Sequence, residues 1–176
     1  MKEVAKNLFC GNDMDFYRSL LCLDDPPRSE MELLMCMPEG WAVVHAAKEP
    51  YHRMALGYTS KGAPKDHPDY LWSERMGNRL ALNMVDAPKQ EFFDKSMIKK
   101  ALSFIEQKLG EGFNVLVHCN IGESRAASLC LLYLVKHGII SGTTFDEAES
   151  EMMQIYPAYN PGEGIRAHLM QCWGEY

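Results

Sequence analysis

The stretch FNVLVHCNIGESRAASLCLLYLVKHG, residues 113–138, is the part of the sequence that decides the fold. Its apolar run at 114–118 is typical of a buried strand, and it leads directly into Cys119. Five residues separate this cysteine from Arg125, and an amphipathic helical pattern covers about 123–137. The pattern predicts an abrupt turn from a strand to a helix that carries a thiol and a guanidinium group.

Such a turn is suited to binding an anion the size of a phosphate group. Several backbone N–H groups point into one small space after the strand, and the helix N-terminus adds the positive end of its dipole. Gly122 lets the loop bend where a side chain would collide with the anion. The planar fork of Arg125 can donate to two phosphate oxygens at once. The predicted phosphate-binding loop comprises Asn120, Ile121, Gly122, Glu123, Ser124 and Arg125.

Cys119 lies at the base of this predicted loop, where the same positive field favours the thiolate form. A thiolate beneath a bound phosphoryl group is placed for in-line attack on phosphorus. A lone buried cysteine is more often inert, so the prediction depends on its combination with Gly122 and Arg125. The combination predicts a nucleophilic cysteine that forms a phosphocysteine intermediate.

Length and composition are those of an ordinary globular protein. The 176 residues have room for a single domain, 1–176, with a real core. Hydrophobic residues make up 47% and charged residues 24% of the chain, which is typical of soluble proteins. The formal net charge of −6 argues against broad binding to nucleic acid or to an anionic membrane, because both need clustered Lys and Arg.

The N-terminal residues and the cysteines predict a cytoplasmic protein. No apolar run approaches the length of a membrane span, and the first residues lack the apolar core of a signal peptide. The six cysteines contain no CxxC pair and match no metal-ligand spacing, so neither a metal nor another cofactor is expected. A reducing compartment is the better expectation for a chain of this size. They are Cys10, Cys22, Cys36, Cys119, Cys130 and Cys172.

The rest of the chain alternates between strand-like and helix-like patterns. Strands or strand pairs are expected at 4–11, 41–47, 79–85 and 114–118, and helices at 15–23, 90–109, 123–137, 143–156 and 164–173. Thr144 and Glu147 have the spacing of a capping box. Residues 48–78 are expected to form a long surface excursion with a short helix, and the Met-rich stretches at 31–37 and 152–156 to fill the core. These patterns predict an α/β fold with a central, mostly parallel sheet flanked by helices on both faces.

The residues HCNIGESR at 118–125 resemble the signature loop of the cysteine-dependent protein tyrosine phosphatases, and the compact chain resembles their dual-specificity branch. The resemblance extends to VAKNLFCGNDMD, WAVVHAAKE, LNMVDAP and YPAYNPGEGIRAHLMQ, which cover most of the chain. It is weakest at 24–40 and 48–78. It implies a phosphatase fold and a phosphorylated protein as substrate.

The resemblance also implies roles for single residues. His118 is expected to be structural, with its ring hydrogen-bonded to the loop, and not a metal ligand. In the family, an aspartate on a loop before the cysteine protonates the leaving oxygen, and Asp86 follows the expected strand at 79–85 as that role requires. The rival is Asp94, which is expected inside the next helix, and Asp86 could instead only cap a turn. Ser124 is expected to cap the helix, with assistance to the loop as the alternative role, and Glu123 to lie solvated at the pocket rim.

Ala126 departs from the family pattern. The family usually has Ser or Thr directly after the arginine, and its hydroxyl stabilises the departing thiolate in the second chemical step. A minority, the phosphatases of regenerating liver, also have alanine there and are slow in that step. Ser128 is not expected to substitute, because it points elsewhere on the helix.

Other functions on the same chemistry remain as alternatives. A rhodanese-like or arsenate-reducing enzyme also uses a cysteine in an anion-binding loop, but His118 and Asp86 favour a phosphatase. A lipid, RNA or small-molecule phosphatase is an alternative, although the loop residues 120–124 contain no lysine. A phosphate-binding pseudophosphatase is the third, and Ala126 leaves room for it.

Overall fold

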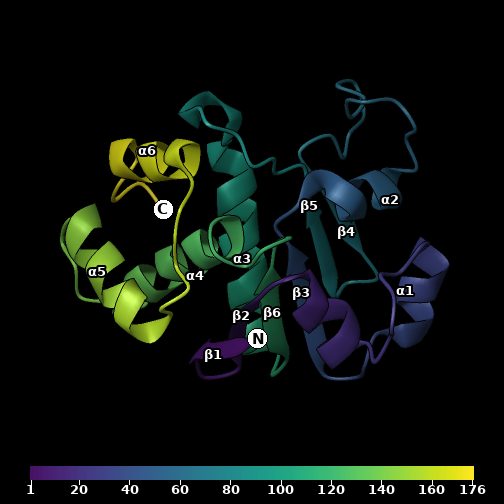
Figure 1. The fold of residues 1–176 in the computed structure, drawn as a ribbon, viewed down its shortest axis with the longest axis horizontal. Helices are drawn as coiled ribbons and strands as arrows, with labels where there is room; N and C mark the ends of the chain where they lie inside the picture. Colours follow the sequence, from purple (N-terminus) through teal and green to yellow (C-terminus); the bar gives the residue numbers. More distant parts are fainter.

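The computed structural model describes residues 1–176 and contains one six-stranded sheet in the order β1-β2-β6-β3-β5-β4 (Figure 1). The strands are β1 (Lys2–Ala5), β2 (Leu8–Gly11), β3 (Trp41–His45), β4 (Trp72–Arg75), β5 (Arg79–Leu82) and β6 (Asn114–His118). The four inner strands are parallel, and the two edge strands, β1 and β4, are antiparallel to their neighbours. The predicted α/β fold with a mostly parallel sheet is confirmed.

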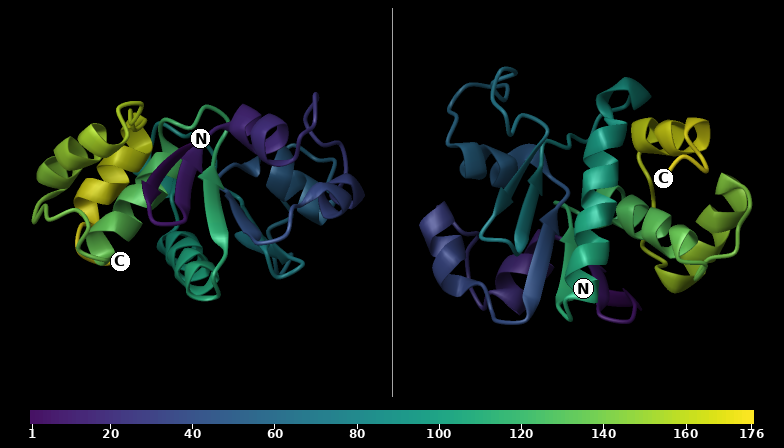
Figure 2. Two further views of the ribbon diagram at one scale, coloured as in Figure 1. Left: turned by 90° about the horizontal axis from the view of Figure 1, so that it is seen from below. Right: turned by 180° about the vertical axis from the view of Figure 1, so that it is seen from behind.

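Helices cover both faces of this sheet. Figure 2 shows α3 on one side of the strands and the N-terminal helical segment η1 on the other. The helices are η1 (Asp15–Leu20), α1 (Glu30–Cys36), η2 (Lys48–His52), α2 (Arg53–Leu56), η3 (Gln90–Phe92), α3 (Lys95–Gly110), α4 (Arg125–Lys136), α5 (Phe145–Ile155) and α6 (Glu163–Gln171). The predicted capping box at the start of α5 is present, with both reciprocal hydrogen bonds.

Helix α3 begins later than expected from the sequence. The prediction placed its start near residue 90, but Gln90–Phe92 form a separate turn and the helix starts at Lys95. Asp94 is the N-cap residue, because its carboxylate accepts hydrogen bonds from the N–H groups of Ser96 (2.8 Å) and Met97 (3.2 Å). Asp94 is therefore not inside the helix, which corrects the expectation for it.

Two elements were missed in the weakly patterned segments. Helix α1 is started by Ser29, whose side chain accepts from the Glu32 N–H. Its methionines are not core filler as predicted: Met31 is 62% and Met35 is 78% exposed, and only Leu33 is fully buried. Within 48–78, the chain forms the short helix α2 and also strand β4, which extends the sheet at its edge.

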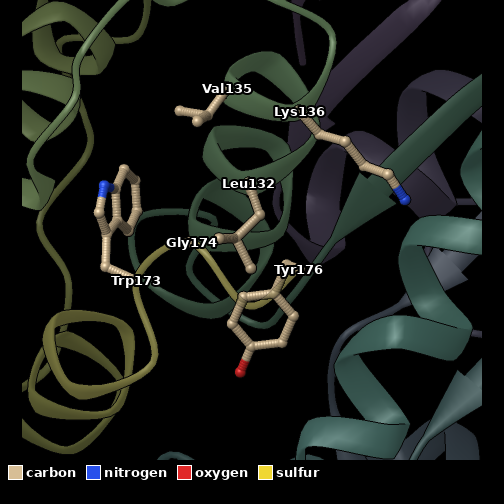
Figure 3. A pocket seen from close by; sticks show the side chains of 6 residues that line it. All are labelled: Leu132, Val135, Lys136, Trp173, Gly174 and Tyr176. Atoms are coloured by element: carbon tan, nitrogen blue, oxygen red, sulfur yellow. The ribbon is translucent and has the colours of Figure 1, made fainter.

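The C-terminal residues pack on the outer side of α4. A small cavity of about 70 Å3 separates them from the helix, and Figure 3 shows its lining side chains. The lining consists of Leu132, Val135, Lys136, Trp173, Gly174 and Tyr176. None of the helices is both long and apolar enough to span a membrane.

Candidate active site

The residues predicted to carry the chemistry lie where the inner parallel strands end. Strand β6 ends at His118, α4 begins at Arg125, and the six residues between them form the turn predicted from the sequence. His118 is level with the last residues of both neighbouring strands, Gly11 of β2 and His45 of β3. The carboxyl ends of parallel strands are the usual place for a binding site, because loops from several strands meet there.

Gly122 is the residue whose identity the loop fixes most tightly. Its φ is +91°, in the region that favours glycine. A Cβ atom at this position would also lie 2.9 Å from the carbonyl oxygen of Gly11. The backbone of the loop therefore touches the end of β2, and no residue with a side chain fits there.

Cys119 lies at the base of the loop and is 2% exposed. Its Sγ accepts a hydrogen bond from the Gly122 N–H over 3.3 Å. It borders a cavity of about 190 Å3, which is lined by Asp86, Cys119, Ile121, Glu123, Ser124, Arg125, Asn160 and Gly162. The predicted nucleophile is thus reachable from one small cavity whose wall carries both acidic and basic groups.

The Arg125 guanidinium is held in place by two hydrogen bonds. Nη1 donates to the carbonyl oxygen of Met84 (3.1 Å), and Nη2 donates to Oδ1 of Asn120 (2.9 Å). Nε is buried and has no hydrogen-bond partner. A buried donor without an acceptor costs free energy, so this nitrogen is a ready donor for a bound anion.

The two candidate acids differ in their surroundings. Asp86 lines the cavity with Cys119, its side chain is 49% exposed, and its Oδ2 lies 3.8 Å from Nη2 of Arg125. Asp94 caps α3 and does not line that cavity. The structure therefore brings Asp86, and not Asp94, to the predicted nucleophile.

Ser124 does not cap α4 as expected from the sequence. It occupies the N-cap position, but its side chain forms no capping hydrogen bond. Its Oγ instead accepts from the N–H of Gly162, which ties the loop to the segment before α6. Elsewhere on the rim, Ile121 is 64% exposed, and the Glu123 carbonyl oxygen accepts from the Asn160 N–H.

His118 contacts two side chains that the sequence analysis did not single out. Its Nε2 lies 2.6 Å from Nδ1 of His45, and its Nδ1 lies 3.3 Å from Oδ1 of Asp13. Burial lowers the pKa of both histidines, and the Asp13 carboxylate opposes this effect at His118. Arg79 also joins this group, since its Nε donates to Nε2 of His45 over 3.3 Å.

These contacts were not readable from the sequence because they depend on strand register. His45 pairs with His118 across the sheet, and Arg79 lies on β5 two residues before the partner of His45. Without the strand order, one cannot tell that their side chains lie on the same face of the sheet. The sole local signal was that each is a polar residue in or beside an apolar strand.

Comparisons with known proteins identify a family that matches this chain. Residues 62–173 match the family model described as dual specificity phosphatase, catalytic domain. A dual specificity protein phosphatase 1B of Arabidopsis thaliana is 41% identical over 116 residues, which cover 57% of this chain and 68% of that protein. A dual specificity protein phosphatase 12 of Mus musculus is 26% identical over 124 residues, covering 70% of this chain but 36% of that protein.

Solved structures share the fold over nearly the whole chain. The structure of DUSP15 has a TM-score of 0.62 and 20% identity, and the match covers 99% of this chain and 88% of that one. A human tyrosine phosphatase-like serine/threonine/tyrosine-interacting protein has a TM-score of 0.58 and 18% identity, with 97% and 93% of the two chains covered. At these identities the likeness establishes the fold.

Proposed function

The chain belongs to the dual specificity phosphatase catalytic-domain family, and we propose that it hydrolyses phosphotyrosine, and also phosphoserine and phosphothreonine, in phosphorylated proteins. The reaction passes through phosphocysteine at Cys119, with no metal or other cofactor. Asp86 is the general acid and Arg125 binds the phosphoryl oxygens, together with the backbone N–H groups of residues 120–124.

One observation carries this proposal: a single cavity is bordered by Cys119, Arg125 and Asp86. The Gly122 N–H points at Sγ, which favours a thiolate there. The partnerless Nε of Arg125 is a donor that a phosphate oxygen satisfies. Cys119 and Asp86 have separate tasks in the cavity, since the thiolate attacks phosphorus and the protonated carboxyl group supplies a proton.

In the first step, the Cys119 thiolate attacks phosphorus and the S–P bond forms as the bond to the leaving oxygen breaks. Protonated Asp86 gives its proton to that oxygen, so the alcohol or phenol leaves neutral. In the second step, ionised Asp86 takes a proton from water as the water oxygen attacks phosphorus. The S–P bond breaks, inorganic phosphate is released, and the thiolate is restored.

A phosphate-binding domain with slow turnover is the second candidate, and Ala126 is the observation that favours it. Ala126 is fully buried at the start of α4 and offers no hydroxyl group. Ser128 does not replace it, because its Oγ pairs with the Tyr159 hydroxyl group over 3.3 Å.

We also propose that the protein is located in the cytoplasm. The proposal is supported by the six cysteines, which are all free thiols.

Hydrolysis of p-nitrophenyl phosphate by the Cys119→Ser variant tests the proposal. Turnover is expected to vanish while inorganic phosphate still binds, because the backbone donors and Arg125 remain. Cys22→Ser is the matched control, since this cysteine is exposed and is not among the residues that line the cavity. Near wild-type turnover in Cys119→Ser contradicts the phosphatase mechanism, and a wild type that binds phosphate without turnover supports the second candidate.

A further inference from the structure

We propose that His45 and Arg79 are positioning residues that keep His118 neutral with its proton on Nδ1. Through Asp13, this fixed imidazole orients the donors of the phosphate-binding loop, up to the guanidinium of Arg125. The catalytic consequence rests on the function proposed above, whereas the protonation state of His118 does not.

The direction of the hydrogen bonds starts at Arg79, because a guanidinium group only donates. Arg79 is fully buried, and its Nη1 and Nη2 donate to Glu30 over 3.1 and 3.0 Å. Its Nε donates to Nε2 of His45 over 3.3 Å. Nε2 of His45 is therefore an acceptor and carries no proton.

The neutral His45 ring must then carry its proton on Nδ1. That nitrogen lies 2.6 Å from Nε2 of His118, so Nε2 of His118 accepts a hydrogen bond from it and carries no proton. The proton of His118 consequently lies on Nδ1, which has no hydrogen-bond partner and lies 3.3 Å from Oδ1 of Asp13, within ion-pair distance. Two rigid rings transmit the polarity of Arg79 across the sheet, from β5 through β3 to β6.

Asp13 also accepts hydrogen bonds from Asn120 of the loop and from Tyr51 of η2. Its Oδ2 accepts from Nδ2 of Asn120 (2.9 Å), and its Oδ1 accepts from the Tyr51 hydroxyl group (3.1 Å). The other end of the Asn120 amide, Oδ1, accepts from Nη2 of Arg125 (2.9 Å). Two series of contacts thus end at the Asp13 carboxylate, and each begins at an arginine: Asn120 donates a hydrogen bond to it, and Nδ1 of His118 lies beside it.

This arrangement opposes protonation of His118. A second proton, on Nε2, would face the N–H of His45 at a separation of 2.6 Å between the nitrogens. His45 cannot reverse its own tautomer without facing the N–H of Arg79. Burial also lowers the pKa of His118, although the nearby Asp13 and Asp15 act in the other direction.

The remaining neighbours of the ring add no opposing charge. Phe16 of η1 stacks on His118, with ring centroids 4.6 Å apart, and Tyr51 of η2 meets it edge-on at 4.9 Å. Burial raises the pKa of the Tyr51 hydroxyl group, so it stays neutral. If the two histidines only filled space in the core, the position of their protons would not matter. A test that reads the position of the proton therefore distinguishes a positioning role from a packing role.

Replacing His45 in two ways separates positioning from packing. In His45→Asn, the side-chain amide still offers one donor and one acceptor, so His118 is expected to keep its tautomer. In His45→Leu, a side chain of similar size offers neither, so Nε2 of His118 loses its donor and becomes free to take a proton. The readout is the two-bond 1H–15N spectrum of the imidazole groups in 15N-labelled protein between pH 5.5 and 8, which identifies tautomer and charge.

The wild type and His45→Asn are expected to show neutral His118 with the Nδ1 proton throughout, and His45→Leu to titrate or change tautomer. The kcat/KM for p-nitrophenyl phosphate is expected to fall about tenfold in His45→Leu, with a new ionisation in its pH profile. His45→Asn should stay within about threefold of the wild type. Arg79→Met gives the same tautomer test from an independent residue, if His45→Leu does not fold.

An unchanged His118 spectrum in both His45→Leu and Arg79→Met would overturn the proposal, as would a wild-type ring that is charged or carries its proton on Nε2. The spectra need no turnover. A wild type that fails to hydrolyse phosphate esters but shows the expected spectra therefore contradicts the proposed function alone.

Discussion

At the scale of single residues, the choice between two carboxylates decides how the leaving oxygen obtains its proton. Asp94 is occupied by the N–H groups at the start of α3, whereas Asp86 lines the cavity with Cys119. A general acid must reach the reacting group, so geometry comes before any argument from acidity. The sequence favoured Asp86 because it follows a strand, with Asp94 as the rival, and the structure distinguishes them by the start of α3 and by the lining of the cavity.

Substitution of Asp86 by asparagine is expected to lower kcat on phosphotyrosine peptides by about 100-fold or more, the usual size of a general-acid contribution. The decline of activity at alkaline pH should also disappear, because no proton remains to be lost from this position. The measurement is steady-state kinetics across pH. Asp94→Asn is the matched control, since asparagine caps a helix as well as aspartate. A larger loss in Asp94→Asn than in Asp86→Asn means that the assignment is wrong.

A single residue, Ala126, is also expected to set the rate of the second step, the hydrolysis of phosphocysteine. The hydrogen bond at Sγ of Cys119 comes from the Gly122 N–H, and no hydroxyl group follows Arg125. A hydrogen bond to a charged group contributes about 1.5–3 kcal/mol. Its absence slows hydrolysis of phosphocysteine by about 10- to 100-fold. We expect a burst of p-nitrophenol in rapid-quench experiments, followed by a low steady rate.

Ala126→Ser is expected to raise the steady rate and to reduce the burst. The attack step should change less, because a donor on the thiolate also reduces its nucleophilicity. Ser128→Ala is a control on the same helix, since that hydroxyl group already pairs with Tyr159. A wild type without a burst, together with a serine variant that is no faster, shows that another donor serves the departing thiolate.

At the scale of elements, what could be predicted depended on how local the signal was. The strand β6 was predicted at its observed bounds, and the start of α4 within two residues, because the apolar run, Gly122 and the helical stripe lie in one stretch of chain. Helix α1 was missed because its exposed face carries Met31 and Met35, which read as core residues. The helix has only seven residues and buries only Leu33, so it is too short to be stable without tertiary contacts.

The hydrogen-bonded residues behind the loop, Glu30, Arg79, His45 and His118, come from several helices and strands and form no single sequence motif. Glu30 of α1 holds Arg79 of β5, although the two lie 49 residues apart in the sequence. A strand partner cannot be identified from a single chain before the strand order is known. The motif therefore predicted the loop residues and His118, while His45 and Arg79 behind them were found only from the register of three strands.

At the scale of the whole molecule, buried histidines couple folding to pH. Four of the six histidines have a pKa lowered by burial: His45, His52, His118 and His168. In the unfolded chain these rings take up protons near pH 6.5, whereas in the folded chain they resist doing so. The unfolded state therefore binds more protons, and the free energy of unfolding decreases as pH falls below about 6.5.

We expect urea denaturation to show this loss clearly between pH 7 and pH 5. A ring that stays neutral in the folded state accounts for about 2 kcal/mol over that interval. The carboxylates with lowered pKa values, such as Asp13, act at lower pH, because their charge is lost near pH 4 and below. Their contribution is thus separated in pH from that of the histidines.

His45→Asn is expected to reduce this pH dependence by about 2 kcal/mol, because the ring that resists protonation is gone. Val44→Ala is the matched control: it lies next to His45 on β3, is equally buried, and removes no titratable group. This control should lower the free energy of unfolding by a similar amount at each pH. The measurement is urea unfolding at pH 7, 6 and 5, followed by tryptophan fluorescence. A wild-type stability that is flat over this range contradicts the prediction, because it means that the rings bind protons equally well in the folded and unfolded states.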